Sequence, residues 1–247
     1  KNRRTALMAQ LNVDHPDLLE FLHVKLDLSQ LTNFNISVAI TDKFIEACEN
    51  NDNWEFKFNN KRYKVYQTNR LSSDGTSEVI NIVALSQEDA LERAKLHHLN
   101  LWNDTFEDVQ EVNFKAIDLW DRLWENAVKS GEPGIFNLSL TNRYTNMSYF
   151  LKMNATNPCG EIPLDSYANC CLGHINLSNM VNEEGSDLDW NRLARTIRTG
   201  IRFLDNVLTV NHYPLEECKT AGDRSRRIGL GTMGLHHMLI KLRIKYG

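Results

Sequence analysis

The sequence lacks the features that mark three classes of protein. It has no run of about 18 or more apolar residues, so no segment is long enough to predict a membrane-spanning helix. The basic start, Lys1 to Arg4, is not followed by the apolar segment of an export signal, so we expect a cytoplasmic protein. Lysine and arginine total 28 against 32 aspartates and glutamates. This balance argues against the basic surface of a nucleic-acid-binding domain.

Cysteine is also scarce, with five in 247 residues, which argues against a framework of disulfides. Three of the five, Cys159, Cys170 and Cys171, nevertheless lie close together. In a reducing compartment such clustering indicates either metal binding or redox chemistry. The rest of the composition, 42% hydrophobic and 24% charged, is typical of a folded globular chain.

Apolar periodicity predicts strands and helices that alternate along most of the chain. Strands are expected from Arg3 to Val13, at 35–40 and at 135–140. Helices are expected after Asp14, after Thr41 or Asp42, and at 116–128, 188–208 and 233–246. Pro214 is expected to open one more helix. Asp14, Thr41 or Asp42, and Asp187 are the expected helix caps. Repeated alternation favours the α/β class, with a largely parallel sheet or barrel.

Residues 54–112 have a different pattern. Alternating apolar residues predict strands at 54–58, 63–66 and 78–83, with a turn at 72–75. Ser86 and Asp89 resemble a capping box in front of a helix at 90–101. We therefore predict an inserted sheet-plus-helix module at 54–112, between two parts of the main domain at 1–53 and 113–247.

The sequence around Cys159 places three functional groups at alternate positions. These are the amide of Asn157, the thiol of Cys159 and the carboxylic acid of Glu161. In an extended loop alternate side chains project to one side, so all three could face one substrate. Pro158 and Gly160 between them discourage a helix. A turn with an incidental cysteine is the alternative that this short pattern leaves open.

The wider context resembles a known family. Asn157–Glu161, followed by Cys-Cys-Leu-Gly-His-Ile-Asn-Leu-Ser at 170–178, is similar to the active-site finger loop (about 154–178) and the next strand of ribonucleotide reductase large chains. Further landmarks in order are residues 14–17, 33–38, 202–206 and 226–235. The resemblance covers nearly the whole chain. It implies an internal fragment that carries part of a ten-stranded α/β barrel of the ribonucleotide reductase and glycyl-radical type.

The resemblance also implies radical-based reduction of ribonucleotides to 2′-deoxyribonucleotides. Cys159 would carry a transient thiyl radical, Glu161 would act as general base, and Asn157 would bind the sugar hydroxyls. Cys170 would be one of two thiols that close to a disulfide as the 2′ hydroxyl leaves. The family places the second thiol upstream of Lys1. Because Cys171 directly follows Cys170, the sequence leaves open which of the two is the reductant.

The form of the motif and its spacing from Cys170 look like those of the adenosylcobalamin-dependent enzymes. The expected partners are therefore adenosylcobalamin, a ribonucleotide, deoxynucleotide or ATP effectors, and a thioredoxin-like external dithiol; a homodimer is compatible with the sequence. The resemblance also implies that Arg3 and Arg4 align with the end of a loop that, in the family, communicates the identity of the bound effector to the substrate site, although a solvated basic terminus would look the same. The alternatives are a metal-radical (class I) large subunit, a non-catalytic nucleotide-binding relic, and a cysteine hydrolase that uses His174 as base.

Two other motifs resemble known binding sites but do not meet their requirements. Gly229 to Gly234 fits the dinucleotide fingerprint but lacks the preceding apolar strand and the later acidic residue, so we predict a tight strand-to-helix passage there. Cys170, Cys171 and His174 lack the gap between cysteines of a usual zinc site, so we expect no metal.

Overall fold

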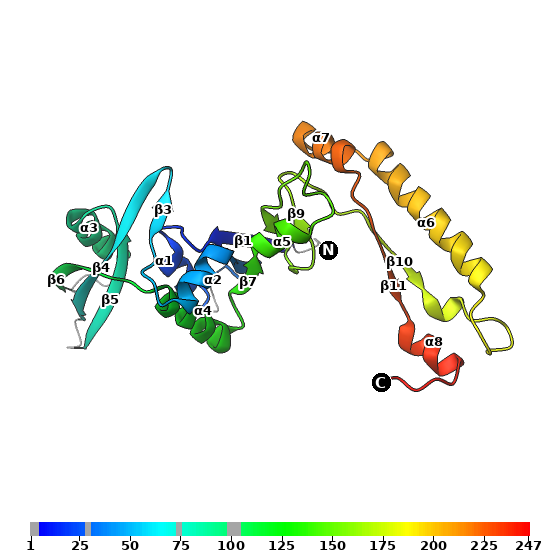
Figure 1. Ribbon diagram of the computed structural model, residues 1–247, viewed down its shortest axis with the longest axis horizontal. Helices are drawn as coiled ribbons and strands as arrows, with labels where there is room; N and C mark the ends of the chain where they lie inside the picture. Colours follow the sequence, from blue (N-terminus) through cyan, green and yellow to red (C-terminus); the bar gives the residue numbers. More distant parts are fainter. Residues whose placement is uncertain (1–4, 28–30, 73–75, 98–104) are drawn as a thin grey trace. The chain divides into compact units, whose positions relative to one another are not determined.

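The computed structural model describes residues 5–27, 31–72, 76–97 and 105–247 (Figure 1). The chain divides into two compact units, Lys1–Asp165 and Ser166–Gly247. Each unit contains parallel strands covered by helices. Within the described residues, no helix has both the length and the apolar character that crossing a membrane requires.

The first unit is built on a parallel sheet of three strands, β1 (Leu7–Asn12), β2 (Phe34–Ile40) and β7 (Gly134–Asn137), in the order β1-β2-β7. The register pairs Met8 with Asn35 and Gln10 with Ser37. Side chains alternate across a sheet, so Gln10 and Asn35 share the face opposite to Val38. A parallel sheet at this place was expected and is confirmed.

Three helices pack on the apolar face of this sheet, namely α1 (Leu18–His23), α2 (Asp42–Glu49) and α4 (Ala116–Ser130). Their buried residues form one core with β2, which includes Leu18, Leu22, Val38, Ile40, Phe44, Leu119 and Leu123. Burying each such large side chain contributes about 1.5–3 kcal/mol. The predicted cap of α2 is confirmed, because Phe44 N donates to Thr41 Oγ1 at 3.3 Å. Helix α4, expected at 116–128, continues to Ser130 and is capped by Gly131, which has φ +79°.

Two expectations for this parallel sheet and its helices were wrong. Asp14 does not cap α1, which begins only at Leu18, because Asp14 contacts another segment instead. Its carboxylate lies 3.2 Å from Lys57 Nζ, and its carbonyl accepts from Lys57 N at 2.7 Å. The strand expected at 135–140 ends at Asn137, since Asn137 Oδ1 accepts from Leu140 N at 2.8 Å and starts helix α5 (Leu138–Tyr144).

The segment between α2 and α4 forms an antiparallel sheet with β3 (Phe56–Phe58), β4 (Lys61–Leu71), β5 (Ser77–Ala84) and β6 (Thr105–Val112), together with helix α3 (Gln87–His97). β5 and β6 pair with the same part of β4 and so flank it. Strand β6 was not predicted. Ser86 Oγ accepts from Asp89 N at 3.2 Å, as expected of a capping box, but α3 already begins at Gln87. Residues 73–75 of the expected turn and 98–101 of the expected helix lie outside the described residues.

This sheet shares part of its packing with the main core. Trp54, Phe56, Val65 and Val83 belong to the same apolar cluster as α1, α2 and α4. A second, smaller cluster lies between the sheet and α3, with Tyr66, Ile82, Ala84, Ala90 and Ala94. The module is therefore distinct in topology but packed on the main domain, and its boundaries at 54–112 stay a prediction.

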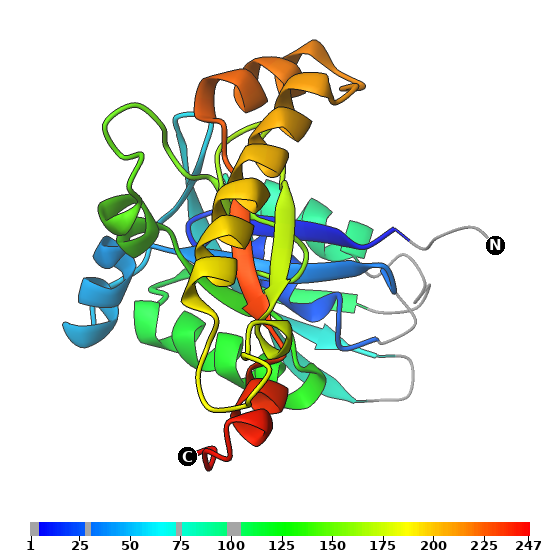
Figure 2. The same ribbon diagram turned by 90° about the vertical axis from the view of Figure 1, so that its right-hand side faces the viewer.

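The second unit contains one parallel pair of strands, β10 (Leu172–Asn176) and β11 (Gly229–Met233), with helices α6 (Trp190–Val210), α7 (Glu216–Ser225) and α8 (Leu235–Lys241). Figure 2 shows α6 running along this pair. Helix α6 packs closely on the two strands because Gly173 of β10 and Gly200 of α6 have no side chains at the contact. A Cβ on Gly173 would lie 3.5 Å from the Leu204 side chain, and one on Gly200 would lie 3.2 Å from the Leu230 side chain. The cap of α6 is Asp189 rather than the expected Asp187, since Asp189 Oδ1 accepts from Arg192 N at 2.8 Å.

The predicted passage at residues 229–234 is confirmed. β11 ends at Met233, Gly234 adopts φ +72°, and α8 follows directly. The helix expected at 233–246 is thus shorter, covering Leu235–Lys241. Within the described residues the parallel strands form a set of three and a set of two, and neither set closes into a barrel.

Candidate active site

The Asn157–Glu161 motif lies in a hairpin of the first unit. Strands β8 (Ala155–Thr156) and β9 (Pro163–Leu164) pair antiparallel on either side of it. Asn154 N donates to Leu164 O at 2.8 Å, and Asn157 N donates to Ile162 O at 3.3 Å. The motif therefore forms the closed end of a hairpin rather than an open loop.

The end of the hairpin is a β-turn with Pro158 and Cys159 at its centre. Gly160 N donates to Asn157 O at 2.9 Å and closes the turn. Cys159 is not among the described residues with positive φ, whereas Gly160 has φ +78°. A type II turn needs a positive φ at its third residue, so this turn is of type I, in which proline is favoured at the second position. The expectation of an extended backbone was wrong here, because the chain reverses between Asn157 and Gly160.

The three functional side chains are brought together on this hairpin but differ in their surroundings. Cys159 and Glu161 are exposed, whereas Asn157 is half-buried. Asn157 Oδ1 accepts from Ile162 N at 3.0 Å and so braces the two arms of the hairpin. The thiol and the carboxylate are open to a ligand, while the amide oxygen already has a structural contact. Their catalytic roles stay predictions.

Side chains from the parallel sheet hold the hairpin in place. Gln10 Nε2 on β1 donates to Asn154 O at 2.8 Å, and Asn35 Nδ2 on β2 donates to Pro158 O at 2.6 Å. Sequence analysis did not identify Gln10, and it included Asn35 only within the landmark 33–38, without a role. The feature that could have identified them is a carboxamide side chain in an otherwise largely apolar strand, in the middle of β1 for Gln10 and near the start of β2 for Asn35. Because Gln10 and Asn35 share one face of the sheet, the hairpin lies against that face.

The cysteine pair belongs to the second unit, and the two thiols have different surroundings. Cys170 is exposed, whereas Cys171 is half-buried and its Sγ donates to Leu204 O on α6 at 3.5 Å. On the other side, Asn169 Nδ2 donates to Cys218 O on α7 at 3.0 Å. The residues on both sides of Cys170 are therefore tied to helices. All five cysteines are thiols rather than disulfides.

The remaining candidates have other surroundings. Arg3 and Arg4 lie outside the described residues, so their proposed role stays a prediction. His174 lies in β10 beside Gly231, where an added Cβ would be 3.0 Å from its ring. Within the described ranges, histidine, cysteine and acidic side chains form no group of three or more that could hold a metal ion.

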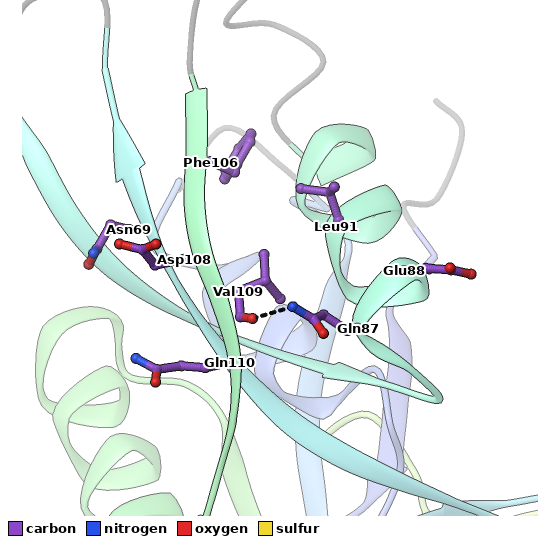
Figure 3. A pocket seen from close by; sticks show the side chains of 8 residues that line it. All are labelled: Asn69, Gln87, Glu88, Leu91, Phe106, Asp108, Val109 and Gln110. Carbon is purple, nitrogen blue, oxygen red and sulfur yellow. Dashed lines mark hydrogen bonds between the residues drawn. The ribbon is translucent and has the colours of Figure 1, made fainter.

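A cavity of about 750 Å³ lies in the module, between α3 and the edge of β6 (Figure 3). Gln87 Nε2 crosses it to Val109 O at 2.7 Å. Its lining mixes acidic, amide and apolar side chains, namely Asn69, Gln87, Glu88, Leu91, Phe106, Asp108, Val109 and Gln110. None of the hairpin or cysteine-pair residues contributes to it.

Comparison with known proteins identifies the family. Residues 1–247 match the family described as ribonucleotide reductase, barrel domain. A vitamin B12-dependent ribonucleoside-diphosphate reductase of Thermoplasma acidophilum is 34% identical over 99% of this chain and 26% of its own length. One of Mycobacterium tuberculosis is 33% identical over 99% of this chain and 28% of its own. A ribonucleoside-diphosphate reductase subunit alpha of Chlamydia muridarum is 35% identical over only 53% of this chain. The chain thus spans about a quarter of the length of its B12-dependent relatives.

Proposed function

Because the chain belongs to the ribonucleotide reductase barrel-domain family, we propose that it is the radical-bearing part of an adenosylcobalamin-dependent ribonucleotide reductase. The observation that carries this proposal is the hairpin. It presents an exposed thiol, Cys159, at the centre of a closed turn, with the exposed carboxylate of Glu161 two residues later. A hydrogen-bonded backbone with exposed reactive groups suits a reaction that needs close positioning of substrate and thiol.

In the proposed reaction, two thiols supply the two electrons that reduce the ribonucleotide to a deoxyribonucleotide and water. As a thiyl radical, Cys159 takes the hydrogen from the 3′ carbon, and Glu161 accepts the proton of the 3′ hydroxyl. The 2′ carbon–oxygen bond then breaks, and the hydroxyl leaves as water with a proton from the dithiol. Cys170 and a second thiol supply two electrons and become a disulfide, and Cys159 returns its hydrogen to the 3′ carbon. An external dithiol of the thioredoxin type then reopens the disulfide.

The cofactor suits this site because the thiol at the hairpin tip is exposed and can meet a partner group. Adenosylcobalamin would supply the radical that removes the hydrogen atom from Cys159. The B12-dependent relatives match 99% of the chain, whereas the subunit alpha matches 53%. This difference favours the cobalamin type over the metal-radical type.

The surroundings of the two adjacent cysteines favour Cys170 as the reductant thiol. Disulfide exchange needs a thiol that a partner thiol can reach. Cys170 is exposed, whereas Cys171 is half-buried beside α6, so a partner thiol can reach Cys170 more easily. We assign Cys171 a structural role, as the residue that fixes the start of β10 on α6.

The proposal extends to the partners of the complete protein. These are a ribonucleotide substrate, deoxynucleotide or ATP effectors sensed near Arg3 and Arg4, and a second copy of the chain in a homodimer, all in the cytoplasm. The fragment alone is expected to be inactive, because the parallel strands among its described residues do not close a barrel.

The test uses the complete protein that contains this chain. Ribonucleoside diphosphates or triphosphates are supplied with a dithiol, with and without adenosylcobalamin, and deoxynucleotide is measured. We expect product only when the cofactor is present. A requirement for a separate metal-containing subunit would instead establish the class I alternative, and nucleotide binding without any product would establish the relic.

A further inference from the structure

We propose that Asn35 is a positioning residue for Cys159, and that it acts by fixing the central peptide of the hairpin turn. This inference rests on the proposed function, in which Cys159 is the reacting thiol. The contact that carries it is the bond from Asn35 Nδ2 to Pro158 O, at 2.6 Å. Pro158 O belongs to the peptide group that joins Pro158 to Cys159, so the bond acts on the backbone directly beside the thiol.

The turn's own hydrogen bond does not determine how this peptide is oriented. Type I and type II turns share the bond from the fourth residue to the first, here Gly160 N to Asn157 O, and both accept proline at the second position. They differ chiefly by a flip of the central peptide, which reverses its carbonyl. A flip here would turn Pro158 O away from Asn35. Type II would also need a positive φ at Cys159, which is unfavourable for a residue with a side chain. The bond from Asn35 therefore adds to this preference and holds the central peptide in the observed type I form.

The donor is held by a rigid element. Asn35 lies in β2, paired with Met8 of β1, and the next residue, Ile36, is 1% exposed. The carboxamide must present its nitrogen to Pro158 O, since its oxygen would only repel another carbonyl oxygen. The sheet thus sets the position of the donor, and the donor sets the orientation of the peptide beside Cys159.

The orientation of this peptide decides where the thiol points. A flip changes ψ of Pro158 and φ of Cys159 and so redirects the bond from Cα to Cβ of Cys159. Hydrogen transfer requires the reacting atoms in close contact and alignment, and a misplacement of about 1 Å can cost about 100-fold in rate. Asn35 therefore affects the chemical step without touching the substrate.

The experiment replaces the donor in the complete enzyme. Asn35→Asp keeps the shape but removes the N–H group, Asn35→Gln keeps the donor on a longer side chain, and Asn69→Ala removes an exposed amide from β4 as a control. We expect Asn35→Asp to lower kcat by about 10- to 100-fold with KM unchanged. Asn35→Gln should recover part of the loss, and Asn69→Ala should behave as wild type.

A second measurement reads the turn itself. Hydrogen exchange of a peptide covering 154–165 should become about three- to tenfold faster in Asn35→Asp, the effect of losing one hydrogen bond. Peptides from β1, β2 and α4 should exchange as in wild type. An unchanged kcat, a change in KM alone, or faster exchange throughout the sheet would overturn the inference.

The two proposals can fail separately. Turnover by Cys159→Ser would reject the assigned function whatever Asn35 does. The exchange measurement does not depend on turnover, so unchanged hairpin exchange in Asn35→Asp would reject the positioning role even in an enzyme that uses Cys159.

Discussion

Asn142 of α5 holds Met153 through both polar atoms of its carboxamide. Oδ1 accepts from Met153 N at 2.8 Å, and Nδ2 donates to Met153 O at 3.0 Å. Met153 is 1% exposed and immediately precedes the hairpin, whose first bond is made by Asn154. The arm that carries the candidate radical residue is thus held by side chains at Met153, at Asn154 and, through Asn35, at Pro158.

Replacing Asn142 with alanine should loosen this arm. The substitution removes both bonds to the backbone of Met153, so we expect the free energy of unfolding to fall by about 1–3 kcal/mol, as measured in urea. Asn146→Ala, an exposed amide in the following loop, serves as the control and should change little. Equal stability of Asn142→Ala and Asn146→Ala would show that the contact does not hold the arm.

The two adjacent cysteines should respond differently to substitution. In the complete enzyme Cys170→Ser should allow at most one turnover with a dithiol reductant, because one of the two electron-donating thiols is gone. Cys171→Ser should retain repeated turnover, since its assigned contact with Leu204 O is structural. Product formed per enzyme over time separates the two. Sustained turnover by Cys170→Ser, together with a single turnover by Cys171→Ser, would reverse the assignment.

Gly234 and Gly185 offer a matched pair for the close packing around β11. Both have positive φ, +72° and +66°, so alanine at either costs about 1–2 kcal/mol in backbone strain. At Gly234 the new Cβ would also collide with Asn176 Oδ1, whereas at Gly185 it would lie 3.4 Å from Lys241 O. Gly234→Ala should therefore lower the free energy of unfolding more than Gly185→Ala, and a smaller loss at Gly234 would contradict the observed packing.

Arg226 links the end of α7 to α6, and the link should depend on pH. Arg226 Nε donates to Asp205 Oδ1 at 2.7 Å, which lowers the pKa of the Asp205 carboxyl below its usual value of 3.8. The folded protein therefore binds a proton at Asp205 less readily than the unfolded chain does. The stabilisation from the Arg226–Asp205 pair is fully present at pH values above the unfolded pKa, and it is lost as pH falls through the lowered pKa of the folded state. The difference in unfolding free energy between wild type and Asp205→Asn should be largest near neutral pH and shrink in acid. A difference that grows as pH falls would contradict this.

Local signals explain which elements could be predicted from the sequence. The start of α2 at Thr41 and the end of α4 at Gly131 follow from capping chemistry within one turn of helix. The same rule predicted that Asp14 caps α1, and this was wrong because the Asp14 carboxylate forms a salt bridge with Lys57, which lies far along the chain. Strand β6 was missed because its sequence is rich in acidic and amide residues. Pairing with β4 stabilises it, for example through Lys64 and Glu111 at 2.7 Å.

For the candidate site, the sequence predicted the motif residues but not the residues that hold them in place. Asn157, Cys159 and Glu161 are close in sequence, so a short motif was enough to find them. The residues that hold them could not be found from the sequence, because Gln10 lies 144 residues from Asn154 and Asn35 lies 123 residues from Pro158. No local pattern connects such partners; only the register of the parallel sheet shows that their side chains face the hairpin.

The most direct test of the account is turnover by the complete protein with Cys159→Ser. Cys48→Ala is the control, since Cys48 packs against the core, where burial raises the pKa of its thiol. We predict that Cys159→Ser forms no deoxynucleotide while it still binds ribonucleotide, and that Cys48→Ala forms deoxynucleotide at the wild-type rate. Deoxynucleotide formation by Cys159→Ser would contradict the assignment of the radical to the hairpin thiol.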